Sequence, residues 1–151
     1  MKSEWTEVAA EWCGEQAFTG RNESGGTVAM GPVEEAKACI APMEMLLLGL
    51  AGCTGVDVVL ILRKMRQPLE KVRVEVRAKR ADSHPRVYTE IEITYLLSGE
   101  ELSKQAIEKA IKLSEEKYCS ASAMLEMTAK IRSSYRLVSG SDDTKGTAIH
   151  S

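Results

Sequence analysis

Residues 42–63 read PMEMLLLGLAGCTGVDVVLILR, and this long apolar stretch decides the fold. Pro42 fits the first turn of a helix, where its missing N–H removes no hydrogen bond, so we expect a helix from about Met43 to Lys64. The segment is apolar nearly all round, which is typical of a helix buried on most faces. Asp57 and three glycines interrupt it, which favours a core helix over a membrane span.

Two segments after this helix alternate in the manner of strands. Residues 71–79 place valine and alanine between charged side chains, and residues 87–97 repeat the alternation with isoleucine, tyrosine and leucine. A period of two is typical of strands with one buried face, and the turn between them indicates a hairpin. A second amphipathic helix is expected from about Glu100 to Lys117, after which the chain could continue the helix or restart after a break. Residues 131–137 then alternate as a closing strand.

The N-terminal part of the chain predicts a small antiparallel meander. Residues 3–13 and 15–21 read as short strands around Gly14, and the turn cluster at 22–26 leads into a third strand at 27–31. The side chains expected to face the core here are Trp5, Val8, Trp12 and Phe18. The whole order is βββ-α-ββ-α-β, which predicts an α+β fold with a mostly antiparallel sheet packed on two main helices.

Length and composition indicate one globular domain. The chain has 151 residues, 44% apolar and 28% charged, with a formal charge of −2, which argues against binding to nucleic acid. We expect a domain over 1–138 and a polar, flexible tail over 139–151. Without a secretory signal pattern, a cytoplasmic location is expected. The first helix has more apolar surface than one sheet can cover, so we also expect a homodimer.

The four cysteines give no metal-binding pattern. Cys13 and Cys39 have no cysteine or histidine at ligand spacing, and the histidines, His84 and His150, lie far apart in the sequence. No CxxC pair is present either, so neither a structural zinc site nor a thioredoxin-type motif is expected. In a reducing compartment the remaining thiols are candidates for redox chemistry.

Cys53 and Cys119 are those thiols, although each has a plain packing explanation, because free cysteine is among the most buried residue types. Cys53 lies too deep in its predicted helix for the N-terminal dipole to activate it. Asp57, four residues on, shares its face and would oppose thiolate formation. A reactive Cys53 therefore needs a cation from elsewhere, and Arg21, between glycines in FTGRNESGG, is the candidate.

Residues 42–63 resemble the first-cysteine helix of the OsmC and organic hydroperoxide resistance (Ohr) family. Residues 107–125, IEKAIKLSEEKYCSASAML, resemble its second-cysteine helix, and the resemblance extends over about 3–138. It implies an OsmC-like fold, an intertwined homodimer with its sites at the subunit interface, and a thiol peroxidase that reduces organic hydroperoxides in oxidative stress defence. Cys53 would be the peroxidatic residue and Cys119 the resolving one, with an external dithiol as reductant and no metal or bound cofactor.

The resemblance also implies an arginine from the first hairpin and a glutamate directly after the helix-opening proline. Arg21 matches the arginine loosely. Met43 occupies the position after Pro42, and the acidic residue is Glu44, one step later. Nine residues of helix turn through about 900° and rise about 13 Å, so Glu44 cannot contact Cys53 within one helix. Glu44 is nevertheless retained as a candidate site residue.

A second departure concerns Ser120, which follows Cys119 where peroxidase members commonly have proline. The two departures are typical of a less-characterised OsmC-like branch. Two alternatives to a peroxidase therefore stay open. One is a non-catalytic dimer that binds an apolar or electrophilic ligand, or senses oxidants through the same thiols. The other is a structural dimer in which both cysteines only fill space.

Overall fold

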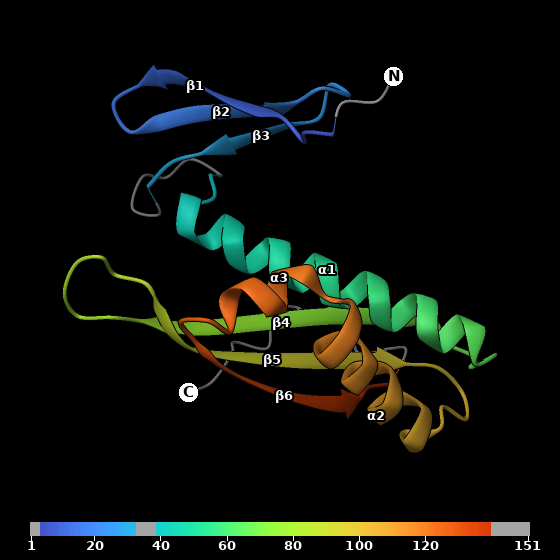
Figure 1. Ribbon diagram of the computed structural model, residues 1–151. Helices are drawn as coiled ribbons and strands as arrows, with labels where there is room; N and C mark the ends of the chain where they lie inside the picture. Colours follow the sequence, from blue (N-terminus) through green and yellow to red (C-terminus); the bar gives the residue numbers. More distant parts are fainter. Residues whose placement is uncertain (1–3, 33–38, 140–151) are drawn as a thin grey trace. The chain divides into compact units, whose positions relative to one another are not determined.

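The computed structural model describes residues 4–32 and 39–139. The chain forms two compact units, Met1–Leu46 and Leu47–Ser151, and each contains one three-stranded sheet (Figure 1). The predicted α+β class and element order are confirmed, with a short π-helix and a third helix in addition. The single domain over 1–138 stays a prediction, and the tail predicted at 139–151 lies outside the described residues from 140 onward.

The first unit is the antiparallel meander that the sequence predicts. It contains β1 (Val8–Gly14), β2 (Ala17–Asn22) and β3 (Thr27–Met30), hydrogen-bonded in the order β1-β2-β3. Asn22 organises the second turn, because its Oδ1 accepts a hydrogen bond of 2.7 Å from the N–H of Gly26. Such side-chain bonds to nearby backbone are the reason asparagine favours turns.

The predicted core of this first unit is wrong. Trp5 and Val8 are each 79% exposed, and Trp12 is 65% exposed. The unit holds three short strands and the first turn of one helix, which is too little structure to cover both faces of a sheet. Its large side chains therefore stay at the surface of the chain.

Helix α1 (Pro42–Lys64) begins and ends where the sequence predicts. Glu44 caps it, since its Oε1 accepts a hydrogen bond of 2.9 Å from the N–H of Ala41, as in a capping box. The prediction that α1 is buried on most of its faces is wrong, however. Only one stripe of the helix is buried, and it consists of Leu50, Thr54, Val58 and Leu62. By length and composition α1 is long and apolar enough to cross a membrane, a property that it shares with core helices of soluble proteins.

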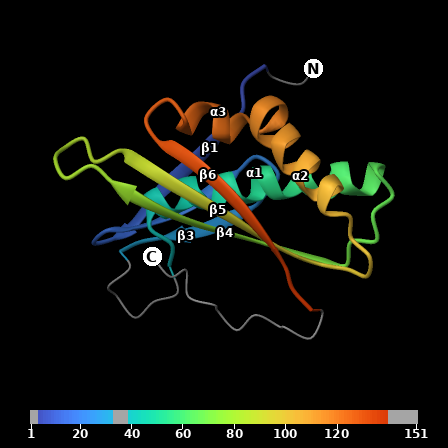
Figure 2. The same ribbon diagram turned by 90° about the horizontal axis from the view of Figure 1, so that it is seen from below.

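The sheet of the second unit combines antiparallel and parallel pairing. Strands β4 (Lys71–Arg80) and β5 (Tyr88–Ser98) form the predicted hairpin, and β6 (Lys130–Leu137) pairs with β5 in parallel. Figure 2 shows α1 crossing behind these strands. The predicted face of β5 is buried at Ile91, Ile93, Tyr95 and Leu97. An added Cβ at Gly55 of α1 would lie 3.3 Å from Val74 of β4, so glycine lets helix and sheet approach closely.

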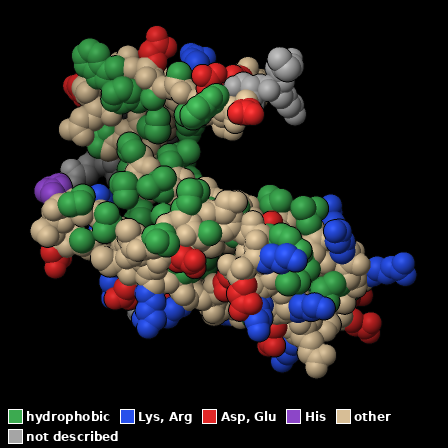
Figure 3. Space-filling view, in the orientation of Figure 1, with side chains coloured by type: hydrophobic (Ala, Val, Ile, Leu, Met, Phe, Trp, Pro, Cys, Tyr) green, Lys and Arg blue, Asp and Glu red, His purple; other side chains and the backbone are tan. Residues whose placement is uncertain are grey.

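The second predicted helix is divided into three pieces. Helix α2 (Lys104–Leu113) starts after Ser103, whose hydroxyl caps it by accepting from the N–H of Ala106. The π-helix η1 (Ser114–Tyr118) follows, and α3 (Ser120–Leu125) restarts after a break. Of the two alternatives left by the sequence, the restart is the one observed. Charged side chains cover α2 in Figure 3, where the exposed residues include Lys104, Glu108, Lys109 and Lys112.

Candidate functional site

The second unit brings Cys53 and Cys119 together. Cys53 lies half-buried near the middle of α1, and Cys119 lies between η1 and α3 with 3% of its surface exposed. Their Sγ atoms and a carboxylate oxygen of Asp57 all lie within 4.8 Å of one another. Both thiols are free. A disulfide requires a sulfur separation of about 2.05 Å, so the two side chains need only approach one another across a short gap.

The π-helix determines where Cys119 lies. Its wide turn ends with a hydrogen bond of 2.7 Å from the N–H of Cys119 to the carbonyl oxygen of Ser114, five residues earlier. Cys119 itself is extended, with φ −78° and ψ 102°, and its Sγ accepts a hydrogen bond of 3.4 Å from the N–H of Ser122. The thiol thus caps α3, and π-turns of this kind occur frequently at functional sites.

Asp57 is the third member of this group. It follows Cys53 by one helical turn, and its Oδ2 accepts a hydrogen bond of 3.0 Å from the hydroxyl of Ser114, which is fully buried. This bond joins α1 to η1 beside the two sulfurs. The spacing of four residues on a helix indicated Asp57 in the sequence, whereas no sequence signal pointed to Ser114.

Burial controls the electrostatics of the group. Burial raises the pKa of the Cys119 thiol, the neighbouring Cys53 raises it further, and hydrogen bonds from Ser122 act against both. Burial likewise raises the pKa of Tyr95 to about 12, with smaller contributions from the negative charges nearby, including Asp57. At ordinary pH, Cys119 is therefore a protonated thiol and Tyr95 a neutral phenol.

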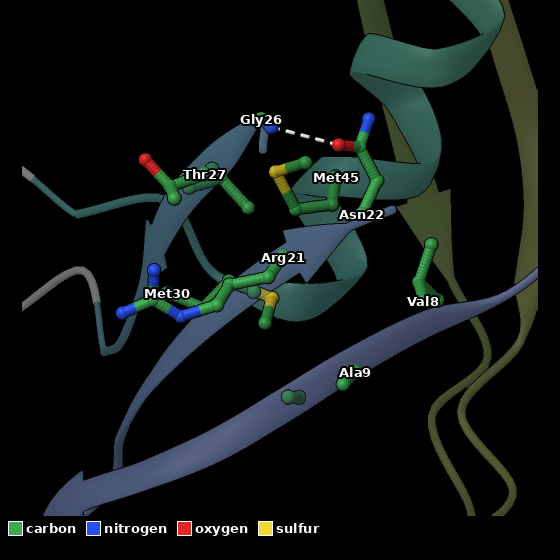
Figure 4. Close-up of a pocket in the computed structure, with 11 residues that line it drawn as sticks. Val8, Ala9, Arg21, Asn22, Gly26, Thr27, Met30 and Met45 are labelled. Atoms are coloured by element: carbon green, nitrogen blue, oxygen red, sulfur yellow. Dashed lines mark hydrogen bonds between the residues drawn. The ribbon is translucent and has the colours of Figure 1, made fainter. Parts of the chain in front are cut away.

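Arg21 and Glu44, the other predicted site residues, belong to the first unit. Arg21 lies on β2 between Ala9 of β1 and Thr27 of β3. It lines a cavity of about 460 Å³ in this unit, whose other lining residues are mostly apolar (Figure 4). Glu44 makes the capping contact with Ala41. The approach of Arg21 or Glu44 to Cys53 stays a prediction.

The two remaining cysteines, Cys13 and Cys39, belong to the first unit. Cys13 is exposed on β1, where its Sγ lies 3.1 Å from the hydroxyl of Thr19. Cys39 is half-buried, close to Gly31. Within the described parts of the chain, neither belongs to a group of three or more metal-ligating side chains.

The fold and the thiol pair together invite comparison with known proteins. The family model described as OsmC-like protein matches residues 35–134. The chain belongs to the OsmC-like family. This OsmC-like protein is 36% identical to protein YhfA of Escherichia coli (strain K12) over 132 residues, which cover 87% of this chain and 98% of YhfA. The resemblance seen in the sequence is therefore confirmed.

Solved structures agree with this assignment. A hypothetical protein from Aquifex aeolicus VF5 is 35% identical to this OsmC-like protein, with a TM-score of 0.80 over 91% of this chain and 98% of the other. The organic hydroperoxide resistance protein OhrB of Bacillus subtilis is 14% identical, with a TM-score of 0.63 over 87% of this chain and 98% of OhrB. At that identity the likeness to OhrB shows a shared fold.

Proposed function

We propose that this OsmC-like protein is a thiol-dependent peroxidase that reduces organic hydroperoxides in oxidative stress defence. The observation that carries the proposal is the approach of the Cys53 and Cys119 sulfurs to within 4.8 Å of each other. Two thiols that are 66 positions apart in sequence, yet adjacent on separate helical segments, fit a pair that cycles between dithiol and disulfide. A pure packing role for both thiols requires no such approach.

The chemistry begins at Cys53, the more exposed of the two. Its thiolate attacks one peroxide oxygen, the O–O bond breaks, and the alkoxide leaves and takes a proton to become the alcohol, while the sulfur becomes a sulfenic acid. The Cys119 thiolate then attacks that sulfur, and the hydroxyl group leaves as water after taking up a proton. An external dithiol reduces the resulting disulfide by exchange and is itself oxidised to a disulfide.

Arg21 is proposed as the cation that stabilises the Cys53 thiolate, with Glu44 holding the arginine. A positive charge is needed because Asp57 lies beside the sulfurs and disfavours a second negative charge. The location on β2, at the edge of an apolar cavity, suits a guanidinium that also meets the polar end of an organic peroxide. These two roles rest on the family resemblance and on chemistry.

A homodimer in the cytoplasm is part of the proposal. Leu48, Val56 and Leu60 of α1 are 50%, 59% and 54% exposed, and contiguous apolar surface of this kind marks association sites. A second copy of the chain would cover it. A reducing compartment would keep both thiols ready for the next peroxide.

The direct test is a peroxide-consumption assay on the purified full-length chain. With dihydrolipoamide or dithiothreitol as reductant, we expect faster loss of cumene hydroperoxide than of hydrogen peroxide. Cys53→Ser should abolish turnover. When no reductant is added, Cys119→Ser should consume one equivalent of peroxide per chain and then stop. Cys13→Ser is the matched control and should keep full activity. Equal rates for the unaltered chain and Cys53→Ser would refute the proposal.

A non-catalytic dimer that binds a ligand is the second candidate, and the first unit supplies the observation that favours it. The cavity of about 460 Å³ there is lined mainly by apolar side chains, among them Val8, Val28, Met30 and Met45, and it is large enough for a small apolar ligand. Saturable binding of an apolar fluorescent probe, unchanged in Cys53→Ser and without peroxide turnover, would favour this function.

A further inference from the structure

The group formed by Cys53, Asp57 and Cys119 contains the ligands of a metal site. Each residue offers one ligand atom, and the three atoms lie within 4.8 Å of one another. In a tetrahedral zinc site with Zn–S bonds of about 2.3 Å and Zn–O bonds of about 2.0–2.2 Å, neighbouring ligand atoms lie about 3.5–4 Å apart. Small side-chain movements are therefore enough to close these three atoms around one ion.

Ser114 holds the carboxylate in position for such an ion. Its buried hydroxyl donates to Oδ2 of Asp57 at 3.0 Å, which leaves Oδ1 free to serve as a ligand. Carboxylates that bind metals are commonly oriented by a second hydrogen bond of this kind. The arrangement also fixes Asp57 on the side of α1 that carries Cys53.

The charges in the group favour a cation. When both thiols ionise, two sulfurs and one carboxylate carry three negative charges within a few ångströms. Within the described part of the second unit, Asp57 forms no ion pair with lysine or arginine, and its side chain accepts a hydrogen bond from Ser114. A divalent cation bound between the three ligands would offset this repulsion, since an opposite charge at such distances strongly favours the ionised forms.

We propose that the reduced chain binds one Zn²⁺ ion through the sulfurs of Cys53 and Cys119 and the carboxylate of Asp57, with a water molecule as fourth ligand. Each coordinating thiol gives up its proton to solvent and becomes a thiolate, and no electrons move. The ion and the disulfide use the same sulfurs and exclude one another. The site shares its thiols with the proposed peroxidase but does not depend on peroxide chemistry.

The test uses the full-length chain carrying Cys13→Ser and Cys39→Ser, so that only the paired thiols remain. The protein is reduced, stripped of metal with a chelator and titrated with Zn²⁺ against a chromophoric competitor, and with Cd²⁺ while its sulfur-to-metal charge-transfer absorbance is followed. We expect one ion per chain, release of the thiol protons on binding, and no binding after oxidation to the disulfide.

Substitutions of Asp57 and Ser114 distinguish a three-ligand metal site from metal binding by the two thiols alone. In that background Asp57→Asn should weaken Zn²⁺ binding by about tenfold or more while the charge-transfer band persists, and Ser114→Ala should weaken it by about tenfold, at the low end of outer-shell effects. Glu116→Gln is the matched control, because Glu116 is an exposed carboxylate on the neighbouring π-helix, and it should leave the affinity unchanged. Alkylating Cys53 and Cys119 in the folded protein of that background should abolish binding without any further substitution.

Each outcome decides the proposal. It is overturned by absence of stoichiometric binding to the reduced protein, by equal affinities of Asp57→Asn and Glu116→Gln, or by binding that survives disulfide formation. A protein that binds Zn²⁺ but consumes no peroxide refutes only the peroxidase. A protein that consumes peroxide but binds no ion refutes only the metal site.

Discussion

The hydroxyl of Ser114 donates a hydrogen bond of 3.0 Å to Oδ2 of Asp57, joining the first residue of the π-helix to α1 beside both sulfurs. Replacing Ser114 by alanine leaves the carboxylate without this partner. Hydrogen bonds to charged groups contribute about 1.5–3 kcal/mol, so we expect the free energy of unfolding to fall by about 1.5 kcal/mol in urea titrations. Ser120→Ala, at an exposed position on α3, is the control and should change it little.

The pH dependence of Cys119 alkylation should be shifted to higher pH than that of an ordinary thiol. Burial raises the pKa of its thiol, and because the thiolate is the reacting form, a higher pKa means a smaller reactive fraction at any given pH. In a variant with the other three cysteines changed to serine, the alkylation rate by iodoacetamide should reach half its maximum above the ordinary value of about 8.5. Low exposure slows the reaction at every pH and does not move this midpoint. A midpoint at or below about 8.5 would contradict the prediction.

Gly99 should tolerate no side chain. Its φ is +157°, and an added Cβ would lie 2.1 Å from the carbonyl oxygen of Pro68, so the backbone itself would have to move. We expect Gly99→Ala to lower the free energy of unfolding by about 3 kcal/mol, measured by thermal or urea denaturation. Gly49→Ala is the contrasting control. Gly49 has open space around it within α1, and alanine there should raise stability by up to about 1 kcal/mol.

The exposed apolar stripe of α1, which contains Leu48, Val56 and Leu60, gives a test of the proposed dimer. Val56 is 59% exposed, so a glutamate there costs little in a monomer but places a charge inside an apolar interface. We expect Val56→Glu to lower the sedimentation-derived mass from that of a dimer to that of a monomer. Lys109→Glu, on the charged side of α2, should leave the mass unchanged. A dimer that persists in Val56→Glu would exclude this stripe as the interface.

Local sequence patterns predicted most elements of the fold. The bounds of α1 and the buried face of β5 followed from periodicity, because both depend on residues close in sequence. Alternation marked β6 as a strand but could not reveal that it pairs with β5 in parallel, which depends on the path of the chain between them. The exposed tryptophans of the first unit were misassigned, since hydrophobicity alone does not say whether a second layer is present.

The candidate site was harder to predict than the fold. Periodicity and spacing did not distinguish Cys53 and Cys119 from cysteines that only fill space in the core. The family resemblance alone identified them as a redox pair. Asp57 was visible through its helical spacing from Cys53. Ser114 was not, because the π-helix turns it toward α1, and a π-turn changes the angular spacing that an ordinary helical pattern assumes.

The parallel pairing of β5 with β6 also affects when, during folding, the two thiols can come together. Strands β4 and β5 are neighbours along the chain and can pair locally, but β6 reaches β5 only after residues 99–129 fold back across the sheet, and such long-range pairing is slow. Cys119 lies on that returning segment. We therefore expect the two sulfurs to be apart in a chain that is still being synthesised. A disulfide between them would then form only after the second unit has folded.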